Sequence, residues 1–349
     1  MEELKPLVDR HSHHLMSRAN VVGVGLGYKE SAGRRTDTKA IVILVSRKIH
    51  PSRLRRVDIV PKTLSAIRTD VIEVGDLHLL LPPAGEAGLS APADSDRTIR
   101  VRPACPGVSV GHYQVTAGTF GALVHDAETG VPMILSNNHV LANITDGRDG
   151  RAKTGDPVYQ PGRYDGGTAD DTIAHLERFA PIVRDAADET CPIARGAERL
   201  GNYLLRLAFP AHQMKLTRRS GGQNLVDAAV ATLINPDDAI GAILGIGPVT
   251  GVVAPTPDLK IMKSGRTSGA TKGEVRLIGA SVRIGLGDVG SAVFTDQIVT
   301  TAIAQPGDSG SLVVTQDGHQ AVGLLSAGSA QASIVSRMDN VLEILGLVL

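Results

Sequence analysis

Three residues in this chain could together carry out acyl transfer, and they occur in the order His, Asp, Ser. His139 ends the run Ser-Asn-Asn-His, Asp227 stands at the start of an apolar segment, and Ser309 lies in a Gly-Asp-Ser-Gly turn before an apolar segment. A serine hydroxyl is a poor nucleophile at neutral pH unless a base lies within reach and a carboxylate orients that base. A Gly-Asp-Ser-Gly turn alone would be an ordinary tight turn, so the prediction of nucleophilic catalysis depends on all three residues.

The turn around Ser309 also offers donors for the negative charge that develops in acyl transfer. In a Gly-x-Ser turn, the backbone N–H groups of Gly307 and Ser309 can converge on one point. Glycine at position 307 leaves room for a substrate carbonyl and permits a positive φ at low cost. We therefore expect Gly307 and Ser309 to form an oxyanion hole.

Two aspartates compete as the carboxylate that orients His139. Asp227 precedes the apolar run Ala228-Ala229-Val230-Ala231, and Asp171 precedes a similar segment nearer to His139 in the chain. Asp171 follows a stretch rich in turn residues, where carboxylates are usually solvated. We favour Asp227 and keep Asp171 as the alternative.

The composition limits the partners of the protein. Among 349 residues, 36 are Lys or Arg and 36 are Asp or Glu, so the formal net charge is +0 and no basic surface for nucleic acid is indicated. The N-terminal segment lacks the apolar core of a signal peptide, and no apolar run approaches the roughly 18 residues of a membrane span. Two cysteines are too few for a disulfide framework. We expect a cytoplasmic protein with a protein or peptide substrate, no nucleic-acid or membrane partner, and no cofactor or metal.

Short Val- and Ile-rich segments separated by Gly, Asp-Gly and Pro turns predict a mainly β fold. The first part reads as a small α+β unit with strands at 21–27 and 39–45, and the stretch 69–74 ends it. A Pro-, Ala-, Gly- and Ser-rich stretch over 81–96 has the composition of a linker. We therefore expect an accessory domain with its linker over 1–95 and a second domain over 96–349.

Two segments interrupt the β pattern of the second domain. Apolar residues at helical spacing predict a helical insertion over about 185–220 and a short closing helix over 339–345. The other segments predict strands, among them 119–124 and 132–135. If the protein forms homo-oligomers, we expect contacts through the N-terminal domain or the insertion.

The motifs resemble those of the trypsin/chymotrypsin-like serine peptidase superfamily over roughly residues 107–349. Asn137-Asn138-His139-Val140 is similar to the histidine motif of HtrA-type proteases, Val226–Ala231 to the aspartate strand, and Gly307–Ser311 to the nucleophile turn. Lys263–Gly273 is similar to the opening of the second barrel in streptogrisins. The appended N-terminal module and absent export signal most resemble the intracellular bacterial and plant narrow-leaf type.

This resemblance implies two packed six-stranded β-barrels with the reactive residues in the cleft between them. It implies His139 as general base, Asp227 as its orienting carboxylate and Ser309 as nucleophile. It further implies that substrate binds along Ser326, Ala327 and Gly328. Ile303 falls at the base of the specificity pocket, which indicates a preference for a small or medium apolar side chain before the scissile bond.

One departure from the family concerns Asp308. The chain has no Ile-Val-Gly-Gly-like start after a basic cleavage site, so a freshly cut N-terminus is not expected to pair with this carboxylate. Asp308 must then be held in another way.

The leading hypothesis is a serine endopeptidase, and the alternative is a protease-fold binding or scaffold protein with latent or no turnover. An α/β-hydrolase esterase is disfavoured because its histidine comes last in the chain and its serine lies in Gly-x-Ser-x-Gly. Labelling by a fluorophosphonate probe that depends on Ser309 separates the two remaining hypotheses.

Overall fold

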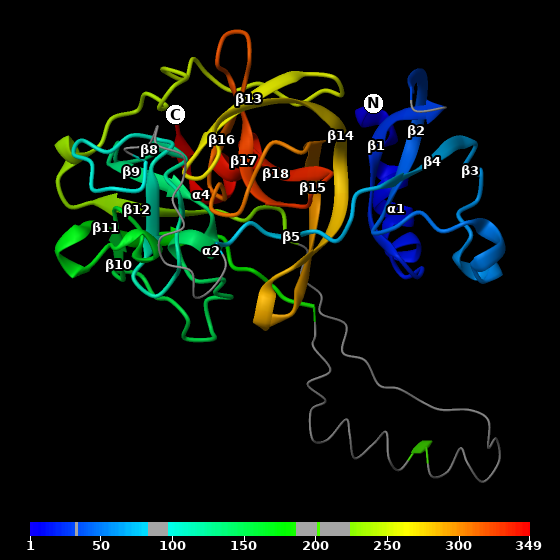
Figure 1. Cartoon of the computed structure of the whole chain (residues 1–349), viewed down its shortest axis with the longest axis horizontal. Helices are drawn as coiled ribbons and strands as arrows, with labels where there is room; N and C mark the ends of the chain where they lie inside the picture. Colours follow the sequence, from blue (N-terminus) through cyan, green and yellow to red (C-terminus); the bar gives the residue numbers. More distant parts are fainter. Residues whose placement is uncertain (32–33, 83–96, 186–200, 203–223) are drawn as a thin grey trace.

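A computed structural model describes residues 1–31, 34–82, 97–185, 201–202 and 224–349. The described residues form a mainly β structure with one sheet of eight strands and one of eleven, together with a few short helices (Figure 1). The insertion predicted over 185–220 lies almost entirely outside the described residues. No helix among the described residues is long and apolar enough to cross a membrane.

The N-terminal region packs one helix against a small sheet. The helix α1 (Lys5–Met16) buries Val8, Leu15 and Met16, which recur at helical spacing. The strands are β1 (Val21–Ser31), β2 (Arg34–Val45), β3 (Thr63–Leu64) and β4 (Ile67–Glu73). β2 lies between β1 and β4, antiparallel to the first and parallel to the second, which accounts for its fully buried run from Ala40 to Val45. The strands predicted in this region are confirmed.

The eight-stranded sheet has the order β19-β8-β9-β12-β11-β10-β6-β7. Its strands are β6 (Ser109–His112), β7 (Gly118–Thr119), β8 (Ala122–Asp126), β9 (Pro132–Ser136), β10 (Pro157–Tyr159), β11 (Thr172–Phe179), β12 (Ala229–Leu233) and β19 (Leu347–Val348). The helix α2 (Asn138–Leu141) follows β9. This sheet has eight strands rather than the six that the resemblance implies, and β19 comes from the end of the chain.

The single strand predicted over 119–124 is wrong, because Phe120 and Gly121 separate β7 from β8. The reason is the approach of the turn that contains Ser309. A Cβ atom added at Gly121 would lie 2.1 Å from the Gly310 carbonyl oxygen, so only glycine fits there.

The second barrel is built from six strands of the eleven-stranded sheet, in the order β13-β16-β17-β18-β15-β14, and the pairing of β13 with β14 closes it. These strands are β13 (Lys260–Gly265), β14 (Gly269–Gly285), β15 (Ser291–Thr301), β16 (Leu312–Thr315), β17 (Ala321–Gly328) and β18 (Ala332–Arg337). The helix α4 (Met338–Leu345) follows, which confirms the predicted closing helix. The six-stranded count is confirmed for this barrel.

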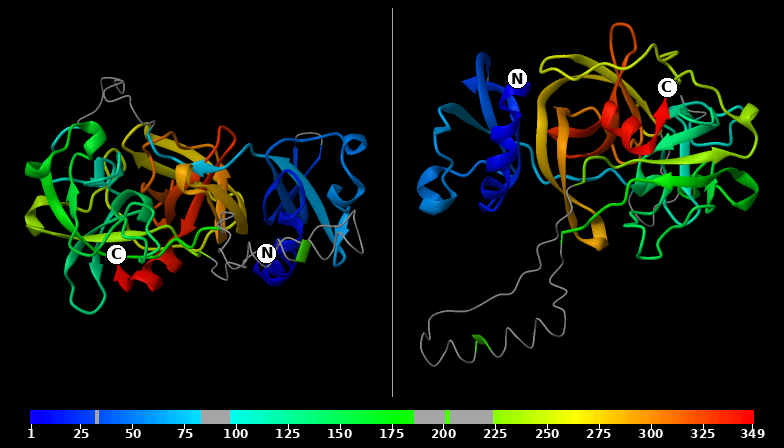
Figure 2. Two further views of the ribbon diagram at one scale, coloured as in Figure 1. Left: turned by 90° about the horizontal axis from the view of Figure 1, so that it is seen from below. Right: turned by 180° about the vertical axis from the view of Figure 1, so that it is seen from behind.

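The N-terminal sheet continues directly from the second barrel. The 17-residue strand β14 pairs with β13 through its first part and with β1 through its later part, at Gly23↔Val282 and Leu26↔Ile278. Both views of Figure 2 accordingly place the blue N-terminal region beside gold β14. The short strand β5 (His78–Leu79) then leads back and pairs with β14 and β17.

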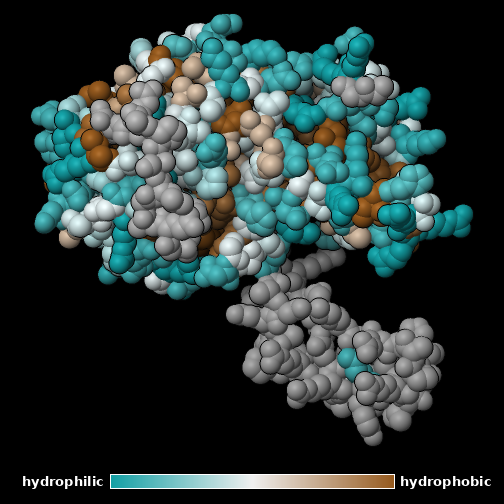
Figure 3. Space-filling view, viewed as in Figure 1, coloured by the Kyte–Doolittle hydropathy of each residue, from teal (hydrophilic) through white to brown (hydrophobic). Residues whose placement is uncertain are grey.

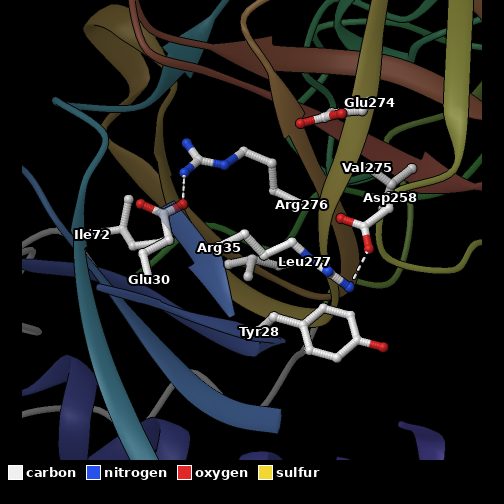
Figure 4. Close-up of a pocket in the computed structure, with 9 residues that line it drawn as sticks. All are labelled: Tyr28, Glu30, Arg35, Ile72, Asp258, Glu274, Val275, Arg276 and Leu277. Atoms are coloured by element: carbon white, nitrogen blue, oxygen red, sulfur yellow. Dashed lines mark hydrogen bonds and ion pairs between the residues drawn. The ribbon is translucent and has the colours of Figure 1, made fainter. Parts of the chain in front are cut away.

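A small pocket of about 50 Å³ lies at this junction and is lined by charged groups (Figure 4). Arg276 forms an ion pair with Glu30, and Arg35 forms one with Asp258 at 2.5 Å. The guanidinium of Arg35 also lies 3.9 Å from the ring centre of Tyr28. The pocket is too small for a peptide and contains none of the predicted catalytic residues. On the face shown in Figure 3, hydrophobic residues form separate groups within a mostly hydrophilic surface.

Candidate active site

His139 and Asp227 form a buried pair on the first sheet. The Nδ1 atom of His139 lies 2.5 Å from Oδ2 of Asp227, and the His139 backbone N–H donates to Oδ1 at 3.2 Å. Both side chains are fully buried. The carboxylate therefore fixes the ring orientation and favours a proton on Nδ1, which leaves Nε2 as the atom that can accept a proton.

Neighbouring amide side chains hold this pair in place. The Asn137 side chain donates to the Asp227 carbonyl at 2.7 Å, and the Asn138 side chain donates to the carbonyls of Thr145 and Ala180. Asn137 thus attaches the start of α2 to the segment that carries the acid, and Asn138 attaches it to the neighbouring segments at Thr145 and Ala180. This explains why amides precede the histidine, which the sequence alone did not reveal.

Ser309 lies in the turn that joins β15 to β16 of the second barrel, and this turn contacts the first sheet. Gly307 has φ +99°, and a Cβ atom there would lie 2.3 Å from Oγ1 of Thr267, so the turn requires glycine on both conformational and steric grounds. The expected positive φ is therefore confirmed. Thr119 fixes the turn from the first sheet, since its N–H donates to the Ser309 carbonyl at 2.7 Å and its hydroxyl donates to the Gly307 carbonyl at 3.0 Å.

The turn and the histidine helix meet at Gly118. A Cβ atom added there would lie 2.4 Å from a Val140 methyl carbon and 3.0 Å from the Ser309 carbonyl oxygen. The residue after His139 and the backbone of Ser309 therefore pack on the same glycine. The Ser309 hydroxyl donates to the Ser326 carbonyl at 3.2 Å, whereas His139 Nε2 has no hydrogen-bond partner among the described residues.

Asp308 is held by a buried lysine. The Lys263 ammonium lies 2.8 Å from Oδ2 of Asp308, and both side chains are fully buried. The N–H groups of Thr267 and Ser268 donate to Oδ1 at 2.9 and 3.0 Å, and the Gln305 N–H donates to Oδ2 at 2.9 Å. Burial raises the pKa of Asp308, but the Lys263 charge and these hydrogen bonds outweigh it, so its pKa lies below the usual value.

Lys263 was missed as a functional residue by the sequence interpretation, although it stands in the quoted Lys263–Gly273 motif. The available signal was strand alternation, which places Lys263 on the same face as the apolar Ile261, and both are buried. The Lys263 ammonium is the cation that holds Asp308 in the buried turn.

The structure also places the alternative acid, Asp171, and the predicted substrate-binding residues. Asp171 does not reach His139, because it caps a short 3-10 turn with Thr168 and pairs with Arg100 at 2.9 Å. Ile303 is buried, and its N–H bonds to the Ser333 hydroxyl at 3.1 Å. Ser326, Ala327 and Gly328 form the end of β17. No group of His, Cys, Asp and Glu residues suited to a metal ion occurs in the described part of the chain.

The N-terminal region of the chain matches a known family of domains. Residues 3–74 match the NARROW LEAF 1 N-terminal domain. No curated protein matches the chain. The NARROW LEAF 1 N-terminal domain thus corresponds to α1 and β1–β4, the region whose sheet continues into β14.

The chain is also similar to several solved protease structures at low identity. A Nocardiopsis protease is 16% identical with a TM-score of 0.44, and the match covers 70% of this chain and 98% of the protease chain. Thermobifida fusca protease A is 16% identical with a TM-score of 0.43, and the match covers 70% of this chain and 97% of the protease chain. A Cellulomonas bogoriensis chymotrypsin is 17% identical with a TM-score of 0.41, and is matched over 70% of this chain and 96% of its own. The assignment of a mainly β, chymotrypsin-like two-sheet fold with a small N-terminal helix–strand region follows from the strand order and closed barrel described above.

Proposed function

We propose that the protein is a serine endopeptidase. His139 is the general base, Asp227 orients it, Ser309 is the nucleophile, and the N–H groups of Gly307 and Ser309 stabilise the oxyanion. The observation that carries this proposal is the buried His139–Asp227 pair, together with Gly118, on which both Val140, the residue after His139, and the Ser309 carbonyl pack.

The proposal assigns one residue to each catalytic step. Attack by Ser309 Oγ on the substrate carbonyl transfers the hydroxyl proton to Nε2 of His139, and the resulting imidazolium is stabilised by the Asp227 carboxylate. The proton then passes to the leaving amine, which leaves an acyl-enzyme. Water adds to the acyl-enzyme with His139 again as base, and this releases the acid and restores Ser309.

A second candidate is a protease-fold binding protein without turnover. The observation in its favour is the Ser309 hydroxyl, which donates to Ser326 and not to His139. The intact set of His139, Asp227 and Ser309 favours the enzyme, because a dispensable set would readily lose a member.

Labelling of the full chain with a fluorophosphonate probe tests the proposal. We expect a covalent adduct on Ser309, located by peptide mass spectrometry, and its loss in Ser309→Ala. Ser281→Ala is the matched control, since Ser281 is buried on β14 outside the site. Absence of Ser309-dependent labelling, including in the Leu80 variants described below, would favour the binding protein. We further propose a cytoplasmic protein that acts on peptides and not on nucleic acids or membranes.

A further inference from the structure

A segment of this chain already lies on the strand where substrate is expected to bind. The short strand β5 pairs antiparallel with the end of β17, with Leu79 opposite Ala327 and His78 opposite Gly328. An extended peptide that adds a strand to an exposed sheet edge is a general mode of peptide recognition. Here the added strand comes from the same chain, between the NARROW LEAF 1 N-terminal domain and the two-sheet body.

The next residue of this segment reaches the oxyanion hole. The Gly307 N–H donates to the carbonyl oxygen of Leu80 at 2.6 Å. That N–H is one of the two donors assigned to the developing oxyanion, and an acceptor carbonyl at this point is the carbonyl that Ser309 would attack. The peptide bond from Leu80 to Leu81 therefore stands in the position of a scissile bond.

The Leu80 side chain fills an apolar site next to the same strand. It is 7% exposed and belongs to the buried apolar cluster that contains Ile303, against which Ala304 also packs. A Cβ atom added at Gly328 would lie 3.6 Å from Cδ2 of Leu80. Leu80 thus belongs to the same apolar cluster as Ile303, the residue that the family resemblance places at the base of the specificity pocket.

The segment is fixed from its other side by the rest of the fold. The Leu77 carbonyl accepts from the Gly285 N–H at 2.8 Å, and the Val74 N–H donates to the Val45 carbonyl at 2.9 Å. The Ser329 hydroxyl donates to the Val74 carbonyl. The N-terminal sheet and β14 thereby hold the residues ahead of β5, so this ligand is tethered.

We propose that Leu77–Leu81 is an internal inhibitor that pairs with the end of β17 and with Gly307 as a substrate does, and that Leu80 marks the side chain accepted before the scissile bond. This inference rests on the proposed function, because an internal inhibitor requires that the protein be a peptidase. A tethered ligand acts at about millimolar effective concentration, so even a weakly binding strand excludes external peptides. The Ser309 hydroxyl is directed toward Ser326 while Leu80 occupies the site.

The first test compares fluorophosphonate labelling rates of the full chain and of Leu80→Asp. A carboxylate is disfavoured in the apolar site, so we expect release of the segment and at least a tenfold faster, Ser309-dependent rate. Leu80→Ala keeps the site apolar and should give an intermediate rate. Leu54→Asp is the matched control, a half-buried leucine in the loop after residues 51–53, and should label at the parent rate. Circular dichroism verifies that each variant is folded.

The second test measures binding without turnover. A fluorescent peptide with the sequence of residues 76–81 is titrated into Ser309→Ala and into Ser309→Ala with Leu80→Asp. We expect binding by the double variant and at least tenfold weaker binding by the single variant, since the internal strand competes. Equal labelling rates together with equal peptide binding would overturn the internal inhibitor. If the double variant alone binds the peptide and no variant is labelled, the result would support the assignment of Leu77–Leu81 as an internal ligand. The same result would contradict the proposal that the protein is an endopeptidase.

Discussion

The two halves of the candidate site differ in how completely they are assembled. On the first sheet, His139 and Asp227 are joined at 2.5 Å, and asparagine side chains attach their backbones to the surrounding loops. On the second barrel, the Ser309 turn is equally well fixed by Asp308 and Thr119, but its hydroxyl faces Ser326 and the Gly307 N–H is occupied by Leu80.

If the chain is the proposed endopeptidase, this difference places its control on the second barrel. His139, the proposed base, is already oriented by the buried Asp227 carboxylate. The nucleophile turn is rigid but its approach is filled by the chain itself. We therefore expect variants of the first half to remove chemistry and variants around β5 to release it.

The largest effect is expected from removal of the base. His139→Ala in the Leu80→Asp background should lower the labelling rate or peptide hydrolysis by about 10⁴-fold, because Ser309 then has no proton acceptor. His175→Ala serves as control, since the ring of that exposed histidine bonds to the Gly155 carbonyl and lies outside the candidate site. A reduction of tenfold or less would show that His139 is not the base.

The next largest effect concerns the buried cation of the nucleophile turn. Lys263→Met leaves Asp308 buried without its partner, and we expect a loss of about 3–5 kcal/mol in the free energy of unfolding in urea. Lys260→Met removes an exposed lysine of the same strand and should cost less than about 0.5 kcal/mol. Addition of Asp308→Asn to Lys263→Met should recover part of the loss. Equal stability of the two lysine variants would contradict the assigned role of Lys263.

Gly307→Ala tests the rigidity of the turn. We expect it to cost about 1–3 kcal/mol from the φ of +99°, and more from contact with Thr267. The same substitution at Gly318 is a close match, because its φ is +86° and no atom lies within 4 Å of the added Cβ. The difference between the two variants in the free energy of unfolding, measured in urea, gives the contribution of the steric contact with Thr267. No difference would mean that the turn has room for a side chain.

A smaller effect is expected from pH. The pKa of Asp308 is lowered in the folded protein, so its stabilising contribution is complete above the unfolded value of 3.8 and is lost as the pH falls below it. The free energy of unfolding should therefore fall with acid less steeply in Asp308→Asn than in the parent chain. Parallel curves for the two proteins between pH 5 and 3 would argue against this coupling.

The smallest effect is expected at the junction with the N-terminal sheet. Arg276→Ala removes a partly exposed ion pair with Glu30 and should change the free energy of unfolding by no more than about 1 kcal/mol. Its labelling rate should equal that of the parent chain. A higher rate would show that this ion pair also restrains β5.

The sequence predicted those parts of the molecule that local patterns encode. The pairing of His139 with Asp227, the glycine at 307 and the strands of the N-terminal region follow from motif spacing and apolar periodicity. The pairing of β1 with β14 did not, because no local pattern specifies which distant edge a strand joins. The contact of the Leu80 carbonyl with Gly307 could not be predicted for the same reason. In the sequence, Leu77–Leu80 lie between a strand region and a proline-rich linker, and only the fold brings them to β17.

The most direct measurement of the central claim is hydrolysis of an acetylated Leu-His-Leu-Leu p-nitroanilide, which carries the sequence of residues 77–80, by the Leu80→Asp chain. We predict release of p-nitroaniline that disappears with Ser309→Ala and has a kcat/KM at least tenfold above that of the analogue ending in arginine. No Ser309-dependent release from either substrate would contradict the endopeptidase, and preference for arginine would contradict the apolar pocket marked by Leu80 and Ile303.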